Sequence, residues 1–146
     1  MPTNGGLIQR EDGSAASPGL AFASDLDTGL LRPGANQFAI STAGNQRLVV
    51  DASGQVGIGE TVPGTLVEIN SETPYVTLKN STQEDTDGGR ESKVIFEGEQ
   101  SGGEITTLAQ IDVSHDGTAD DQKGKLILST NDGADGAAPT AALTIG

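Results

Sequence analysis

The most constraining feature of this chain is a series of short apolar runs between residues 25 and 59, each closed by a turn that contains glycine. Apolar side chains at alternating positions lie on one face of a strand. Glycine and asparagine adopt the positive φ angles that tight turns need. Few side chains in this stretch are suited to catalysis. The pattern is typical of a segment that builds a β structure.

The local pattern predicts individual strands and turns. Residues 38–42 and 46–50 read as strands joined at Ala43-Gly44-Asn45, where glycine or asparagine supplies a positive φ. In 55–59 glycine alternates with Val56 and Ile58, and glycine in a strand marks the close approach of another backbone. We expect that backbone to come from neighbouring chains around an axis, with a weak edge strand as the alternative.

The rest of the chain continues this pattern. Residues 60–65 contain Pro63-Gly64 and predict a boundary. No apolar period of 3.6 residues extends over ten residues, so we expect little or no helix. Strands spaced by polar, glycine-rich turns predict an all-β fold. The further expected strands are 66–69, 75–78, 93–96, 105–113, 125–129 and 141–145.

The composition predicts an oligomer. Among 146 residues there are no tryptophans, one tyrosine and three phenylalanines, so a monomeric core would be thin. The apolar residues are nevertheless patterned, which favours a core completed by other copies of the chain. The net charge of −13 disfavours nucleic acid and anionic membranes as partners. No apolar run reaches the ~18 residues that span a bilayer, so membrane insertion is not expected.

Residues suited to catalysis are scarce. The chain has no cysteine, and its single histidine, His115, lies between Ser114 and Asp116 at the end of a predicted strand. Adjacent strand residues point to opposite faces, so these three are not expected to form a triad, and His115 is expected to be a solvated loop residue. Acidic side chains are abundant, but aromatic residues that stack on sugars are nearly absent. We therefore expect a protein that is not an enzyme.

Acidic loops raise the question of a bound cation. Residues 84–89, 116–121 and 131–136 are rich in Asp and Gly, and oxygen ligands on loops suit Ca²⁺. None has the twelve-residue spacing of a helix–loop–helix calcium site. Asp-Gly pairs are also common turn formers, so we expect turns and no cofactor, with a structural calcium ion as the alternative.

Several segments resemble motifs of phage tail-fibre proteins, especially those of marine and cyanobacterial phages. In the first half these are SPGLAF (17–22), DLDTGL (25–30), ANQ (35–37) and the glycine strand after them. In the second half they are GRESK (89–93), GEQSGG (98–103), SHDGT (114–118) and TNDG (130–133). The resemblance covers roughly residues 14–146. It departs from the family at Leu31, often aromatic there, and at Glu60, where threonine is frequent.

The resemblance implies an intertwined homotrimeric β fibre on a virion, made in the host cytoplasm. Long relatives continue into a receptor-binding tip or an autocleaving chaperone domain, whereas this sequence stops at Gly146. We therefore expect a short tail fibre or a fibre segment that contributes to host adsorption. The expected partners are two more copies of the chain and other tail or baseplate proteins.

We expect four segments: a flexible docking arm (1–19), a proximal interwoven module (20–60), a linker with a connecting strand (61–72) and a distal β domain (73–146). Leu7 and Ile8 are the candidate virion-docking residues. The candidate residues of the threefold core are Phe22, Phe38, Ile40, Leu48, Val50, Val56 and Ile58. The candidate host-facing residues are Asp116, Asp120, Asp121, Asp132 and Asp135.

Two other functions are compatible with the sequence. The acidic loops of the second half could belong to a module that binds a receptor or a cell-surface glycan. A spike or head fibre that decorates the capsid would differ from a tail fibre only in where the arm docks.

Overall fold

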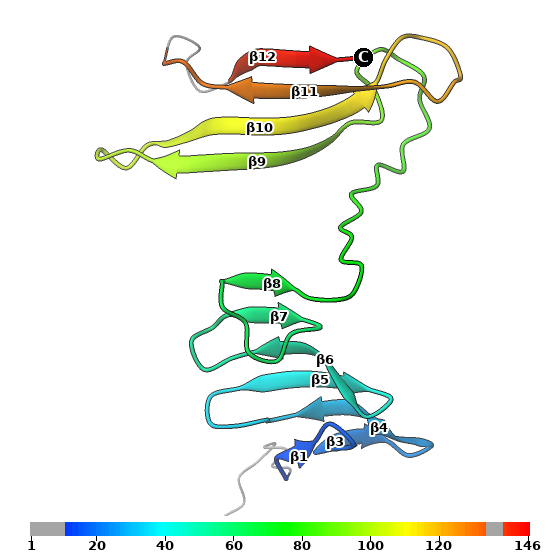
Figure 1. The fold of residues 1–146 in the computed structure, drawn as a ribbon, viewed down its shortest axis with the longest axis vertical. Coiled ribbons are helices and arrows are strands. Elements are labelled where there is room, and N and C mark those ends of the chain that lie inside the picture. Colours follow the sequence, from blue (N-terminus) through cyan, green and yellow to red (C-terminus); the bar gives the residue numbers. More distant parts are fainter. Residues whose placement is uncertain (1–10, 134–138) are drawn as a thin grey trace, which may run out of the picture. The chain divides into compact units, whose positions relative to one another are not determined.

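The computed structural model describes residues 11–133 and 139–146, and in these ranges the chain forms strands, turns and no helix. The predicted all-β fold is therefore confirmed. The chain divides into two compact units, residues 1–75 and 76–146. Each unit contains one main sheet, and Figure 1 shows the strands of each.

The first unit is built from neighbouring strands that follow one another in sequence. A small hairpin pairs β1 with β2, and a six-stranded sheet has the order β3-β4-β5-β6-β7-β8. All pairs in the larger sheet are antiparallel except β7 with β8, which are parallel. The strands are β1 (Gly13–Ser14), β2 (Ser17–Pro18), β3 (Leu20–Phe22), β4 (Asp25–Leu31), β5 (Phe38–Thr42), β6 (Asn45–Val50), β7 (Val56–Ile58) and β8 (Val67–Ile69).

Residues 11–19 of the expected docking arm include the β1–β2 hairpin. Arg32, just after β4, donates hydrogen bonds from Nε and Nη2 to the two carboxylate oxygens of Asp12, at 2.7 and 2.6 Å. The backbone amide of Arg32 also bonds to the Asp12 carbonyl. These bonds connect the segment before β1 to the larger sheet. Leu7 and Ile8 lie outside the described residues.

The turn between β5 and β6 has the positive φ that glycine or asparagine was expected to supply. Gly44 has a φ of 70°, and Ala43 has a second positive φ of 50°. The next turn is closed by Asp51, whose Oδ1 accepts hydrogen bonds from the amides of Ser53 and Gln55 at 2.8 Å. Gly54 supplies the positive φ there.

The two faces of the six-stranded sheet carry different residues. One face is covered by the chain itself and buries Leu31, Ala39, Ser41 and Val49. Gly57 is also buried on this face, opposite Val49. These are mostly small side chains, which allow loops to lie directly on the sheet.

The close backbone approach at Gly57 was predicted, but the predicted source was wrong. A Cβ at Gly57 would lie 2.1 Å from the carbonyl oxygen of Glu60 in the same chain. At Gly59, which has a φ of 73°, it would meet the carbonyl oxygen of Asn70. Because β7 and β8 are parallel, the chain must cross back between them. The crossover accounts for Gly57, and the residue after β8 accounts for Gly59, so both approaches come from the same chain.

The second unit is a four-stranded antiparallel sheet with the order β12-β11-β10-β9 (Figure 1). Its strands are β9 (Ser92–Glu99), β10 (Ile105–His115), β11 (Gly124–Thr130) and β12 (Thr140–Ile145). Each matches a predicted strand. Residues 75–78, also predicted as a strand, have no strand pairing. All four side chains are exposed, and Val76 and Leu78 line a cavity together with Val94 and Ile111 of the sheet. The sequence pattern alone cannot distinguish such an unpaired segment from a strand.

Candidate functional site

The main candidate site in the first unit is the face of the six-stranded sheet opposite the covered one. Cross-strand pairing places Leu20, Leu30, Ile40, Leu48, Ile58 and Ile69 in one continuous row. A second row contains Phe38, Val50, Val56 and Val67. We call these two rows, together with Phe22, the first apolar face.

This face is open to solvent in the single chain. Eight of its side chains are exposed: Leu20, Phe22, Leu30, Phe38, Ile40, Ile58, Val67 and Ile69. Phe22 is the most exposed of them, at 64%. Soluble monomers rarely leave a continuous apolar surface of this kind uncovered, so it indicates an interaction site.

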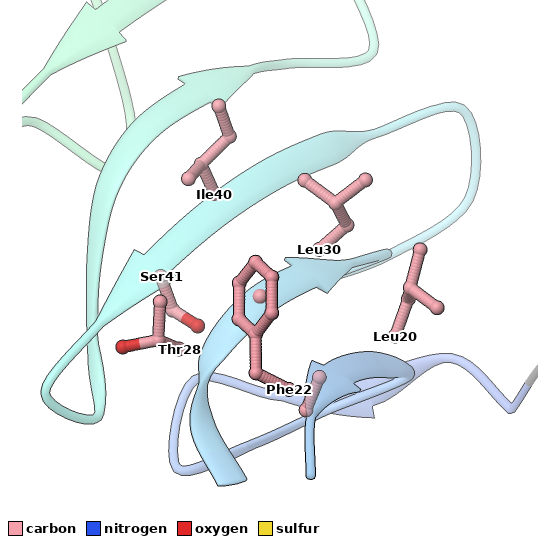
Figure 2. Close-up of a pocket in the computed structure, with 8 residues that line it drawn as sticks. Leu20, Phe22, Thr28, Leu30, Ile40 and Ser41 are labelled. Carbon is pink, nitrogen blue, oxygen red and sulfur yellow. The ribbon is translucent and has the colours of Figure 1, made fainter. Parts of the chain in front are cut away.

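A groove lies at the β3–β4–β5 end of the face. It has a volume of about 430 Å³, and Leu20, Phe22, Leu30 and Ile40 line it. Figure 2 shows these four side chains projecting from neighbouring strands, with Thr28 and Ser41 at one end. None of the described residues that line the groove is charged. The groove is thus suited to an apolar side chain and offers no group for acid–base chemistry.

All seven candidate core residues lie on the first apolar face. Ile40, Leu48 and Ile58 belong to the first row, and Phe38, Val50 and Val56 to the second. Phe22 lies two residues after Leu20 on β3, and both side chains line the groove. The candidate core list left out four members of this face: Leu20, Leu30, Val67 and Ile69. The alternation of Val67 and Ile69 with Glu68 was a signal that could have identified two of them.

His115 is buried, so the prediction of a solvated loop histidine was wrong. Its exposed fraction is 2%. Nε2 lies 3.0 Å from Oδ1 of Asp121, and Nδ1 lies 3.3 Å from the carbonyl oxygen of Thr86. Its backbone bonds to Gly88 and Gly89. His115 therefore holds the 84–89 loop against the end of β10 and contacts neither Ser114 nor Asp116 in a triad arrangement.

Two acidic loops surround His115 and are paired with cations. The hydrogen bond from His115, with those from Lys123, lowers the pKa of the Asp121 carboxyl to about 2. Asp87 lies 2.7 Å from Nζ of Lys125, and this bond lowers the pKa of Asp87. Both carboxylates thus have hydrogen-bond partners within the chain, and these contacts favour their ionised forms. We interpret the cluster as a structural contact between loops.

The candidate host-facing residues have different surroundings. Asp120 and Asp132 are exposed, and Asp116 and Asp121 are half-buried. Asp135 lies outside the described residues. In residues 11–133 and 139–146, no group of three or more His, Asp or Glu side chains is arranged to hold a metal ion.

Comparisons with known proteins add no assignment: no protein-family model, curated protein or solved structure matches this chain. Over the described residues, no helix is long and apolar enough to cross a membrane.

Proposed function

We propose that this protein is a structural component of a phage particle, a homotrimeric short tail fibre or fibre segment that contributes to host adsorption. The observation that carries the proposal is the first apolar face, which runs across six strands and is left largely exposed by residues 11–133 and 139–146. A trimer would bury these rows against the same rows of two other copies. The resemblance of residues 14–146 to phage tail-fibre motifs directs the proposal toward a virion.

The chemistry of the described residues is consistent with a role in assembly. Apart from the hydroxyl groups of Thr28 and Ser41, the residues that line the groove are apolar, and the single histidine is used in holding two loops together. Both features suit a protein that provides shape and adhesion. The proposal accordingly includes no catalytic activity and no cofactor.

The function is tested on virus particles. Antibodies against the purified chain, with gold labels, should bind tail appendages of the virus that encodes it and should reduce adsorption to host cells. The matched control is the same antibody preparation absorbed with the purified chain. Labelling confined to the capsid would contradict a tail fibre, and particles without label would contradict a virion role altogether.

A further inference from the structure

An ion pair in the second unit brings one lysine nitrogen against two carboxylates. Lys93 on β9 and Asp112 on β10 lie directly opposite each other in the register of the sheet. Nζ of Lys93 lies 3.2 Å from Oδ2 of Asp112 and 2.8 Å from Oε1 of Glu91. The sheet therefore holds a nucleophilic group, a carboxyl group and a second acid together.

The carboxylate of Asp112 is buried and only half satisfied. Its side chain is 10% exposed. The second oxygen, Oδ1, is buried and has no hydrogen-bond partner among the described residues. A buried charged oxygen without a partner raises the free energy of the folded state. A reaction that removes the charge of Asp112 would therefore stabilise this unit.

We propose that Lys93 and Asp112 become joined by an isopeptide bond, which the chain forms by itself with Glu91 as the proton carrier. Lysine is a nucleophile in its amine form. Groups that a fold holds in contact react as though they were very concentrated. Nζ contacts Oδ2, the atom bonded to the carbon that Nζ would attack. This modification site is independent of the fibre proposal.

The reaction is a condensation that releases one water molecule. The contacts with Glu91 and Asp112 raise the pKa of Lys93, so its resting form is the ammonium. Glu91 lies within the distance at which a general base accepts a proton, and it passes one ammonium proton to Oδ2 of Asp112. The lone pair of Nζ attacks Cγ and forms the C–N bond. A second proton follows the same route, the Cγ–Oδ2 bond breaks, and Oδ2 leaves as water.

The product fits the surroundings of Asp112 better than the ion pair does. Oδ1 becomes the oxygen of a neutral amide, and the charge of Lys93 disappears with that of Asp112. Glu91 ends the reaction ionised, as it began. The new bond also closes the β9–β10 hairpin into a covalent loop, and such a link stabilises a fold by restricting the unfolded chain, as a disulfide does.

A second ion pair in the same unit lacks these features. Nζ of Lys125 lies 2.7 Å from Oδ1 of Asp87, but 58% of the Asp87 side chain is exposed. Oδ1 of Asp87 also accepts a hydrogen bond from the amide of Gly117. Because this carboxylate is satisfied and open to water, we expect no covalent bond there. Lys125 therefore provides the control.

The intact mass of the full-length chain, measured by mass spectrometry after denaturation, tests the inference. We expect most of the natural chain to be lighter than its sequence mass by one water molecule, with a branched peptide joining Lys93 and Asp112 in a digest. Lys93→Arg keeps the charge but removes the nucleophile, and Glu91→Gln removes the proton carrier. Both variants should have their full sequence masses, whereas Lys125→Arg should still lose one water.

A natural chain with its full sequence mass would overturn the isopeptide bond. A loss of water that persists in Lys93→Arg would also overturn it, because an Asp-Gly pair such as Asp116-Gly117 loses water when it closes into a succinimide ring. Neither result bears on the fibre proposal, which the native mass tests separately.

Discussion

Leu30 on β4 and Ile40 on β5 lie directly opposite each other, and both side chains keep more than a third of their surface exposed, 37% and 36%. Leu20 continues the pair on one side and Leu48 on the other. Such directly paired side chains are the unit that stabilises a sheet. Here the pairs form a continuous row whose outer surface is free, and that row is the centre of the proposed assembly.

A charge in this row should prevent assembly. We expect Ile40→Asp to shift the native mass from three chains to one, because a carboxylate buried in an apolar interface has no partner. Light scattering measures the change. The matched control is Ala52→Asp, which adds the same charge at an exposed turn and should keep the mass of three chains. An Ile40→Asp variant that still assembles would place the interface elsewhere.

Gly57 should tolerate no side chain. A Cβ there would lie 2.1 Å from the Glu60 carbonyl oxygen, so Gly57→Ala must displace the crossover between β7 and β8. We expect a loss of about 1–3 kcal/mol in the free energy of unfolding, measured by chemical denaturation. Gly64→Ala is the control, since its nearest contact would be Glu68 Oε2 at 3.7 Å. Equal stability of both variants would show that the crossover is not packed on Gly57.

Replacing Ala43 with asparagine should stabilise the chain. Its φ of 50° is a left-handed conformation that costs an alanine about 1 kcal/mol, and Asn-Gly is the pair that such two-residue turns favour. We therefore expect Ala43→Asn to raise the free energy of unfolding by up to ~1 kcal/mol. Ala52→Asn, at an exposed turn position with no positive φ, should change little. A destabilised Ala43→Asn variant would contradict this turn geometry.

Asp121 should make the second unit sensitive to acid. Its pKa in the folded chain is about 2, below the ordinary 3.8, so the ionised carboxylate favours the folded state. The stabilisation is present above pH 4 and is lost as the pH falls toward 2. We expect Asp121→Asn to reduce stability more at pH 6 than at pH 2, measured by denaturation at each pH.

The matched control for this experiment is Asp120→Asn, which removes an exposed neighbouring carboxylate. It should leave the pH dependence close to that of the natural chain. A pH dependence that Asp121→Asn leaves unchanged would mean that the contact with His115 does not contribute to stability.

Sequence patterns predicted most strands, because apolar side chains alternate with small or polar ones in 38–42 and 109–113, and 46–50 contains a short apolar run bounded by turn residues. They could not predict the burial of His115, whose contact with Thr86 spans 29 residues and depends on how two loops meet. The same limit explains Gly57: glycine indicated a close approach, but only the crossover path identifies Glu60 as the neighbour. The apolar face was predicted in part, because the candidate core list lacked Leu20, Leu30, Val67 and Ile69.

The native mass of the purified natural chain, measured by light scattering at moderate salt with and without calcium, tests the central claim most directly. The proposed fibre predicts one stable species of three chains, each of 14.8 kDa, in which the first apolar face is covered. A folded species with the mass of a single chain would contradict it, because the first apolar face would then remain open to water.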